Sequence, residues 1–396
     1  MPTAGRAASD MTQRCDALVV GGGPAGSTCA GRLRQAGLNV IVIDKATFPR
    51  HKVCAGWITP SVVESLELDV DDYRRSRTFQ TISSFRTACL GGRTVVIDYG
   101  RPVSFGIRRC EFDEYLLRRS GAALELGEGV KSIERRGGDW IVNDRLSSPL
   151  LIGAGGHFCP VARRLGRRRE IEEVVLAAQE IEFEMDGRQQ AECRVAPEAP
   201  EIYFCEDLKG YGWCFRKANF LNVGLGRLDR RQISSHVADF CRTLQHYGRI
   251  PQSLSEKFRG HAYLDYANSP RELLDDGVLL IGDAAGLAYP QSGEGIRPAV
   301  ESGLMAADVV VEARGNYGRG RLADYEERLG KRFGRRDIRS HAQNPSFPDI
   351  RRKLGRMLLS RRWFVRHVVL DRWFLHRHQK PWKPADFTAR DAADLV

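Results

Sequence analysis

The stretch Asp16–Gly26 reads D-A-L-V-V-G-G-G-P-A-G, and it decides the fold of this chain. Ala17–Val20 is a short apolar run that ends in glycines, as a buried parallel strand does. Gly21, Gly23 and Gly26 then follow the spacing G-x-G-x-x-G. This spacing allows a tight turn, a close approach of the backbone to a pyrophosphate, and close packing of the next helix against the sheet. The stretch therefore predicts a dinucleotide-binding strand, turn and helix.

The residues that follow complete this pattern. Ser27–Gln35 is predicted to form a helix whose N-terminus offers free N–H groups to the phosphates. Leu38–Ile43 is the second predicted strand, and it ends at Asp44, where an acid accepts hydrogen bonds from a ribose hydroxyl. The alternative is a glycine-rich turn that binds nothing. It is disfavoured because the first strand, the glycines, the helix, the second strand and the terminal acid all occur in order. The predicted nucleotide contacts are Gly21, Gly23, Pro24, Ala25, Gly26, Asp44 and Lys45.

A second stretch, far downstream, reads G-D-A-A-G-L-A-Y-P-Q-S-G-E-G over Gly282–Gly295. Val278–Ile281 is predicted to be a strand, so Asp283 lies at its carboxyl end, where open α/β sheets bind ligands. Ile296–Val311 is predicted to be a helix whose N-terminus stabilises negative charge on a bound ring. The alternative is a strand, turn and helix in which the acid only caps the helix.

Two further motifs join these stretches: P-R-H-K-V-C-A-G-W at Pro49–Trp57 and R-C-E-F-D-E-Y-L at Arg109–Leu116. With these four stretches, the chain from about Asp16 to about Gly330 resembles the FAD-dependent oxidoreductases of the geranylgeranyl reductase type. That family lies within the wider group of para-hydroxybenzoate-hydroxylase-like flavoproteins. The resemblance implies that FAD is the cofactor.

The resemblance also implies roles for single residues. Asp283 would bind the ribityl hydroxyls, and the loop that follows would lie beside the pyrimidine edge of the flavin. Arg109 would touch the cofactor, although the adjacent Arg108 leaves the register open. Cys54 matches a cysteine over the flavin ring, where a thiol can donate a proton as N5 delivers hydride; a small apolar filler is the alternative. The cofactor contacts predicted in this way are Cys54, Arg109, Gly282, Asp283, Pro290, Gly293, Gly295 and Ile296.

One departure from the family pattern concerns the electron donor. The family has G-A-D-G, whereas Gly153–Gly156 of this chain reads G-A-G-G and is followed by His157. The missing aspartate helps to place the nucleotide substrate in the hydroxylases, so its absence weakens the case for NAD(P)H docking of that kind. No second G-x-G-x-x-G follows a strand, and the donor stays open among NAD(P)H, ferredoxin and a quinol.

Length and composition set the outer bounds. The 396 residues are enough for about two domains. No apolar run reaches the ~18 residues that a membrane span needs, and residues 1–13 lack an apolar signal core, so we expect a cytoplasmic protein. The 10 cysteines show no C-x-x-C pair and no metal-ligand spacing, which indicates reduced thiols and no metal site.

The predicted fold class is α/β, with a Rossmann-like FAD-binding domain, an antiparallel-sheet substrate domain that interrupts it, and a helical basic C-terminal segment. Phe79–Asp98 and Val174–Arg227 are rich in alternating strands, with turn signals at Gly91–Gly92 and Asp186–Gly187. The predicted boundaries are 14–60, 100–172 and 265–330 for the FAD-binding domain, 61–99 and 173–264 for the substrate domain, and 331–396 for the C-terminal segment.

An aromatic stretch in the second domain is the candidate substrate wall. Tyr211, Trp213 and Phe215 alternate and so project from one face of a predicted strand, with Tyr203 on the hairpin partner. Such a face can line a pocket for an apolar or aromatic small molecule, or form sheet core. The stretch resembles the reductase motif Y-x-W-x-F-P, but Arg216 replaces the proline and could pair with a carboxylate or phosphate of the substrate. These five residues are the predicted substrate contacts.

The C-terminal segment carries most of the positive charge. Between Lys331 and Lys380 there are 15 Lys and Arg residues against 3 Asp residues, although the net charge of the whole chain is only +11. Arg351–Arg377 is predicted to be helical and mixes aromatic with basic residues, which suits peripheral contact with an anionic membrane surface. The alternative is a pair of helices that close the sheet and solvate a basic outer face. No nucleic-acid-binding module is recognisable.

Two enzyme hypotheses follow, with a third from another class. The first is a reductase in which reduced FAD saturates a C=C bond of an isoprenoid-like or other apolar substrate. The second is a monooxygenase in which a flavin C4a-hydroperoxide hydroxylates or epoxidises the substrate. Cys54 and the Tyr211–Phe215 stretch favour the reductase, whereas Arg216 leaves the monooxygenase open. A flavin protein without turnover is disfavoured by the separate aromatic sheet.

Overall fold

The predicted strand Ala17–Val20 lies at the centre of a six-stranded sheet. The computed structural model describes residues 12–166, 175–228, 232–254, 257–336 and 349–385. The sheet has the order β19-β20-β13-β2-β3-β9 and is parallel except for β19. Its strands are β2 (Ala17–Val20), β3 (Val40–Asp44), β9 (Ala123–Leu126), β13 (Leu150–Gly153), β19 (Leu274–Asp275) and β20 (Val278–Leu280). The central strands are buried on both faces, which explains their continuous apolar sequence.

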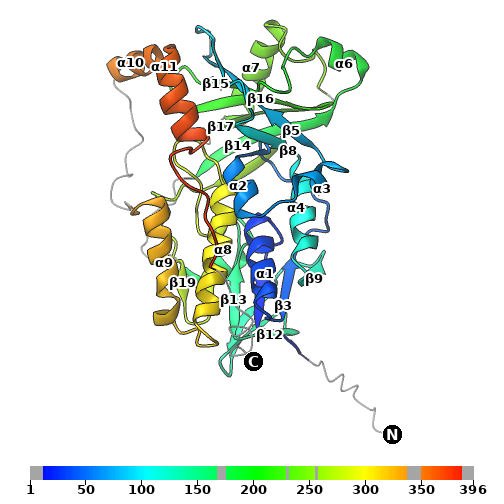
Figure 1. Ribbon diagram of the computed structural model, residues 1–396, viewed down its shortest axis with the longest axis vertical. Helices are drawn as coiled ribbons and strands as arrows, with labels where there is room; N and C mark the ends of the chain where they lie inside the picture. Colours follow the sequence, from blue (N-terminus) through cyan, green and yellow to red (C-terminus); the bar gives the residue numbers. More distant parts are fainter. Residues whose placement is uncertain (1–11, 167–174, 229–231, 255–256, 337–348, 386–396) are drawn as a thin grey trace.

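Helices cover the six-stranded sheet (Figure 1). Helix α1 follows β2 directly and packs along α8, which follows β20 through the short helix η1. Helix α4 packs on α1, α9 packs on α8, and α5 packs on β13. These helices are α1 (Pro24–Gln35), α4 (Arg109–Arg119), α5 (Pro160–Leu165), α8 (Ile296–Glu312), α9 (Arg319–Phe333) and η1 (Gly282–Ala284). A four-stranded sheet of β1 (Gln13–Arg14), β12 (Leu146–Ser148), β11 (Asp139–Val142) and β10 (Ile133–Arg136) adjoins them.

A seven-stranded sheet forms a second layer above the first (Figure 1). Its order is β18-β14-β17-β16-β15-β6-β7, and every neighbouring pair is antiparallel except β15 and β6. The strands are β6 (Ser84–Cys89), β7 (Val95–Asp98), β14 (Leu176–Glu184), β15 (Glu201–Phe204), β16 (Gly210–Lys217), β17 (Phe220–Arg227) and β18 (Arg259–Tyr263). Helix α7 (Ile233–His246) packs on its outer face. The two layers confirm the predicted fold class.

A small sheet joins the layers. It has the order β4-β8-β5, formed by β4 (Trp57–Ile58), β5 (Phe79–Ile82) and β8 (Ser104–Ile107), with α2 (Pro60–Ser65) and α3 (Val70–Arg74) beside it. The domain boundaries stay a prediction. All strands of the six-stranded sheet nevertheless lie within the three ranges predicted for the FAD-binding domain, and those of the seven-stranded sheet lie within the two predicted for the substrate domain.

Two local details differ from the sequence prediction. The signal at Asp186–Gly187 begins α6 (Gly187–Glu192) instead of a strand turn, because Asp186 accepts a hydrogen bond from the Gln189 N–H at 2.8 Å and so caps a helix. The predicted C-terminal helix is interrupted after α10 (Asp349–Leu359), where the Ser360 hydroxyl bonds the backbone of the preceding turn. Helix α11 (Arg362–Phe364) and helix η2 (Val365–Phe374) continue beyond the break.

The C-terminal segment closes the seven-stranded sheet. Helix η2 packs on β6 and β7 through a buried cluster that includes Phe85, Ile97, Val365, Val369 and Phe374. The chain then returns to the start of α8, where buried Arg297 donates hydrogen bonds to the carbonyls of Gln379 and Lys380 at 3.0 and 3.1 Å. This is the closing arrangement that the sequence left as one alternative. Within the described ranges, no helix has both the length and the apolar character needed to cross a bilayer.

Arg297→Met should weaken this closure. The guanidinium is fully buried and also donates to Glu301 Oε1 at 2.8 Å. Its loss removes the donor of the Gln379 carbonyl, whereas Glu301 and the Lys380 carbonyl keep Arg332 as a donor. We expect the free energy of unfolding in urea to fall by about 1–3 kcal/mol. Arg321→Met, on the exposed face of α9, is the matched control and should change it by less than about 0.5 kcal/mol. Equal unfolding free energies for the two variants would contradict the role of Arg297.

Candidate functional site

A cavity of about 780 Å³ lies between the two layers. Its walls come from the glycine loop after β2, the loop from Pro49 to Trp57, strands β16 and β18, and the start of α8. The two stretches that the sequence singled out therefore meet at one place. The predicted contacts that line the cavity are Gly23, Pro24, Ala25, Asp44, Lys45, Cys54, Arg109, Tyr211, Trp213, Asp283, Gly293, Gly295 and Ile296.

The remaining predicted glycines shape the loop without lining the cavity. Gly21 has φ +118°, and a Cβ there would lie 2.4 Å from the Ala154 carbonyl oxygen. A Cβ on Gly26 would lie 1.9 Å from the Gly21 carbonyl oxygen. Both positions exclude any larger residue, which explains the glycines by close chain packing. Gly282 and Pro290 also lie outside the lining.

The nucleotide end of the cavity combines an acid with a cation. Asp44 accepts hydrogen bonds from Gly22 N–H at 2.7 Å and from Ala46 N–H at 2.9 Å, which fixes its carboxylate at the cavity edge. Arg50 also lines the cavity, with Nη2 3.2 Å from Asp113 Oδ2. Sequence reasoning did not single out Arg50, although it lies in the quoted P-R-H-K motif. Its charge beside the free N–H groups of α1 suits a pyrophosphate.

Charged groups converge at the end of β20. Asp283 Oδ2 lies 3.5 Å from His261 Nε2, and Lys52 Nζ lies 3.0 Å from the same nitrogen. Burial opposes ionisation of Asp283, but His261, Lys52 and Arg109 outweigh it and hold its pKa well below the usual range. Burial lowers the pKa of both Lys52 and His261. Asp283 therefore presents a carboxylate to the cavity, as expected for a group that accepts hydroxyl hydrogen bonds.

Arg109 reaches the cavity and Arg108 does not. Arg109 donates from Nε and Nη2 to both carboxylate oxygens of Asp113 at 2.8 Å, which orients its buried guanidinium. Arg108 pairs instead with Glu111 at 2.8 Å and with Glu182 at 3.3 Å, outside the cavity lining. The structure thus places the residue that the family motif indicated, and not its neighbour, at the site.

Tyr211 and Trp213 form an aromatic wall with two residues that the sequence analysis did not predict as substrate contacts. Phe374 of η2 and Trp57 both line the cavity, and their rings stack with centroids 5.4 Å apart and an interplanar angle of 18°. Trp57 was only part of a quoted motif, and nothing in the sequence indicates that Phe374 returns to the cavity. The wall joins the face of the central strand β16 to the C-terminal segment.

Three predicted substrate contacts lie elsewhere. Phe215 is on the cavity side of β16 but is buried behind Trp57, with ring centroids 5.5 Å apart. Tyr203 and Arg216 face the opposite side of the sheet, because side chains alternate along each strand. Tyr203 packs near Phe240 of α7, with centroids 5.7 Å apart. The proposed pairing of Arg216 with a substrate anion in this cavity is therefore wrong.

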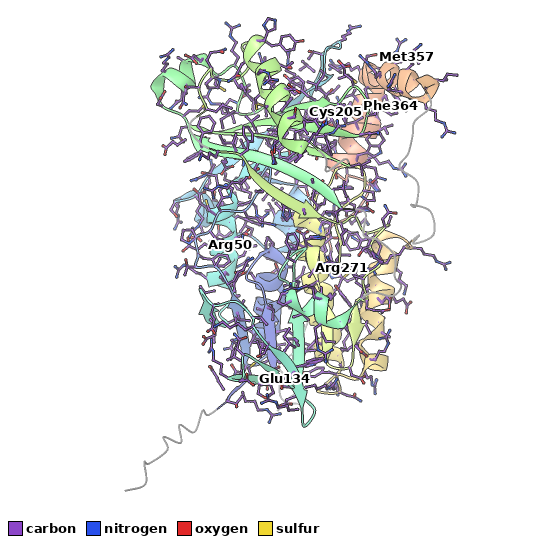
Figure 2. All side chains as sticks on the ribbon, turned by 180° about the vertical axis from the view of Figure 1, so that it is seen from behind. Arg50, Glu134, Cys205, Arg271, Met357 and Phe364 are labelled. Carbon is purple, nitrogen blue, oxygen red and sulfur yellow. The ribbon has the colours of Figure 1, made fainter. Side chains whose placement is uncertain are left out.

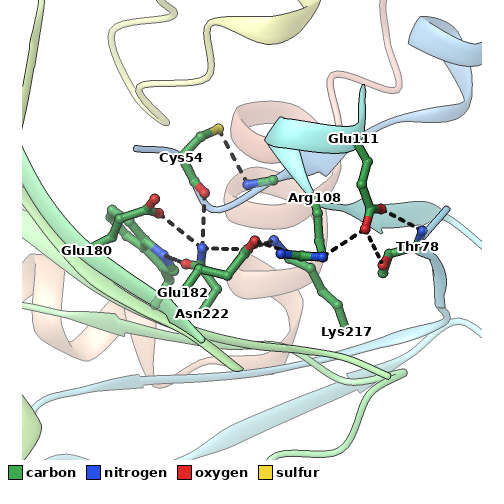
Figure 3. Close-up of polar contacts among 10 residues, drawn as sticks. Cys54, Thr78, Arg108, Glu111, Glu180, Glu182, Lys217 and Asn222 are labelled. Carbon is green, nitrogen blue, oxygen red and sulfur yellow. Dashed lines mark hydrogen bonds and ion pairs between the residues drawn. The ribbon is translucent and has the colours of Figure 1, made fainter. Parts of the chain in front are cut away.

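A buried network fixes the backbone on both sides of Cys54 (Figure 3). Asn222 of β17 donates through Nδ2 to the Cys54 carbonyl oxygen at 3.1 Å, and to Glu180 and Glu182 at 3.1 and 3.0 Å. The Cys54 N–H donates to the Glu180 carboxylate. Trp213 Nε1 donates to Asn222 Oδ1 at 2.7 Å, which connects the network to the aromatic wall. The seven-stranded sheet thereby positions a loop that has no regular structure of its own.

The pKa values of the two glutamates of this network are shifted in opposite directions. Burial disfavours the Glu182 carboxylate, but Lys217 at 2.7 Å and the nearby Arg108 outweigh it and hold its pKa below the usual value. Burial raises the pKa of Glu180 to about 7, since the opposing contacts are weaker. Glu180 therefore changes its charge near neutral pH directly beneath Cys54.

The walls of the cavity fit FAD. Trp57 lines the cavity, and its buried Nε1 has no hydrogen-bond partner among the described residues. The Gly23 loop and Arg50 would hold the pyrophosphate, Asp44 the ribose and Asp283 the ribityl chain. The loop from Gly293 to Ile296 would face the ring, where the N-terminus of α8 favours the negative charge of the reduced flavin.

The sequence matches known flavoproteins. The FAD binding domain family matches residues 14–72. A menaquinone reductase of Mycobacterium tuberculosis is 29% identical over 325 residues, which cover 74% of this chain and 76% of that protein. A geranylgeranyl diphosphate reductase of Rhodobacter capsulatus is 29% identical over 313 residues, which cover 75% of each protein.

Solved structures share the fold. A geranylgeranyl bacteriochlorophyll reductase-like protein of Thermoplasma acidophilum has a TM-score of 0.72 at 20% identity, covering 97% of this chain and 96% of that one. The halogenase PltM in complex with FAD has a TM-score of 0.64 at 17% identity, covering 79% of this chain and 73% of that one. The comparisons confirm the resemblance: this chain is an FAD-dependent oxidoreductase that is similar to proteins of the geranylgeranyl reductase type.

Asp283→Ala should loosen FAD, because it removes the carboxylate that the charged cluster presents to the cavity at the end of β20. We expect the flavin absorbance that stays with the protein after gel filtration to fall at least tenfold at equal FAD loading, as the loss of a charge-assisted contact predicts. Asp275→Ala, an exposed acid on β19 of the same sheet, is the control and should keep its flavin. Full occupancy in the Asp283 variant would remove this residue from the cofactor site.

Glu180→Gln should change how stability depends on pH. Because burial raises the pKa of Glu180 from 4.5 to about 7, its ionisation destabilises the folded state progressively as the pH rises through this interval. The amide cannot ionise, so the unfolding free energy of the variant relative to the wild type should rise by about 3 kcal/mol from pH ~4 to pH ~8.

Glu206→Gln is the control for this pH series, since Glu206 is an exposed glutamate that follows β15. The difference between this control and the wild type should stay constant across the same pH range. A constant difference for Glu180→Gln as well would show that Glu180 does not titrate in the buried network.

Proposed function

We propose that this oxidoreductase reduces a C=C bond of an apolar, isoprenoid-like substrate. The observation that carries the proposal is that one cavity contains the expected flavin loop, the Cys54 thiol and an aromatic wall. Its size lies within the range of small-molecule sites, and its walls combine apolar rings with a few fixed polar groups. The names of two relatives, geranylgeranyl diphosphate reductase and menaquinone reductase, support the same reaction class.

Each residue in the cavity would have a separate role in this reaction. Reduced FAD, when bound, supplies a hydride to one carbon of the double bond. Cys54 holds a proton in the cavity and transfers it from Sγ to the neighbouring carbon, so that one C–H bond forms at each carbon. The thiolate that remains is hydrogen-bonded by Gly56 N–H at 3.4 Å and lies beside the Arg109 guanidinium, and it regains its proton from solvent. Tyr211, Trp213 and Phe374 would exclude water from an apolar chain.

An anaerobic reoxidation experiment tests the reaction class. The FAD-loaded protein is reduced with dithionite, so the result does not depend on the donor, for which NAD(P)H stays a prediction. Geranylgeranyl diphosphate and menaquinone are then added separately without oxygen, and the flavin absorbance and the substrate mass are followed. A reductase returns the oxidised flavin and a product two hydrogens heavier. No anaerobic reaction, with an oxygenated product after air is admitted, would favour the monooxygenase and overturn the proposal.

Cys54→Ser should slow this reaction while FAD stays bound. A serine hydroxyl is a far weaker acid than a thiol, so we expect anaerobic turnover to fall roughly 100-fold. Cys110→Ser is the control, because Cys110 is a half-buried thiol on α4 that does not line the cavity. Unchanged turnover in the Cys54 variant, at equal flavin content, would exclude Cys54 as the proton donor.

A further inference from the structure

The outer surface of α10 and α11 exposes an unusual amount of apolar side chain. Ile350, Leu354, Met357 and Trp363 are 80%, 50%, 47% and 68% exposed. They make up four of the eight large apolar side chains that are exposed among the described residues, although they lie within 14 residues of sequence. We call these four residues the apolar ridge. A scattered exposed leucine needs no explanation, but such a concentration indicates a contact surface.

The ridge lies on a helix that is already anchored on its other side. Ile350, Leu354 and Met357 are spaced by four and three residues, so they share one face of α10. The opposite face packs on the protein: Leu359 is 7% exposed, and a Cβ on Gly355 would lie 2.6 Å from Leu208 Cδ1. Figure 2 shows Met357 at the outer edge of the molecule. The apolar ridge is therefore the face that remains after α10 has docked on the sheet.

The charge around the ridge has a single sign. From Ile350 to Leu370 the sequence contains seven Lys and Arg residues and no Asp or Glu. Five of them are exposed, namely Arg351, Arg352, Lys353, Arg361 and Arg362. A basic amphipathic helix with an aromatic residue at its end is the pattern that lies in the interface of an anionic bilayer.

We propose that the apolar ridge docks this protein on the surface of an anionic membrane. The apolar side chains would enter the acyl boundary while the flanking arginines and lysines contact the headgroups. A second copy of the chain fits less well, because it would bring seven further positive charges to the same contact. Nucleic acid would match the charge but not the four exposed apolar side chains.

The ridge is connected to the cavity through one continuous segment. Helix η2 begins directly after α11 and ends at Phe374, which lines the cavity and stacks on Trp57. If the substrate is isoprenoid-like, this arrangement brings a substrate that resides in the bilayer near the cavity, and this step rests on the proposed function. The docking itself does not, since it follows from the surface of α10 and α11.

Sedimentation with vesicles tests the proposal. The full-length, FAD-loaded protein is mixed, without substrate, with vesicles of phosphatidylcholine alone or of phosphatidylcholine and phosphatidylglycerol. We expect binding to the anionic vesicles, little binding to the neutral ones, and weaker binding as salt is raised. Trp363 emission should shift to shorter wavelength on binding, and the shift should be absent in Trp363→Phe. No sedimentation with anionic vesicles would overturn the proposal.

Two sets of variants separate the contribution of the apolar ridge to vesicle binding from that of the flanking positive charges. Replacing the four ridge residues by serine should abolish binding, and Arg351→Gln with Arg352→Gln should weaken it roughly 25-fold, at about fivefold for each charge. The control for the charge variant is Arg75→Gln with Arg321→Gln, which removes two exposed arginines on other elements. Retained flavin absorbance and circular dichroism verify that each variant is folded. Vesicle binding that survives in both the serine variant and the Arg351/Arg352 variant would contradict membrane docking. So would a ridge that mediates only self-association in sedimentation equilibrium.

Discussion

The carboxylate of Asp283 imposes the constraint on which the site depends. Lys52, His261 and Arg109 come from three separate segments to this carboxylate and together hold its pKa below the usual range. The loop after Pro49, the start of α4 and strand β18 are therefore held at the end of β20. The charged cluster therefore connects the two layers of the fold at the cavity.

Buried polar groups also hold the loop that carries Cys54. The loop that carries Cys54 has no regular hydrogen-bonding partner of its own, so Asn222 and Glu180 satisfy its backbone from the seven-stranded sheet. Buried polar networks of this kind contribute more to a unique geometry than to net stability. The connection from Asn222 to Trp213 means that the position of the thiol and the position of the substrate wall are set by one network.

The parts of the site that the sequence predicts are those with local geometric requirements. The glycine loop, Asp44 and Asp283 follow from spacing and from their places at strand ends, and the structure has each of them there. The errors at Tyr203 and Arg216 have different origins. Arg216 follows Phe215 on one strand, so alternation alone places it on the opposite face. The face of Tyr203 depends on its pairing with Gly212 on the neighbouring strand. Glu180 and Phe374 were missed because burial and the return of a remote segment are properties of tertiary packing.

The position of the C-terminal segment determines when the wall of the cavity is completed during synthesis of the chain. Translation releases the glycine loop first and η2 near the end, yet η2 supplies one ring of the cavity wall and the residues beyond it bond to the start of α8. The cavity therefore lacks one wall until the last part of the chain has been synthesised.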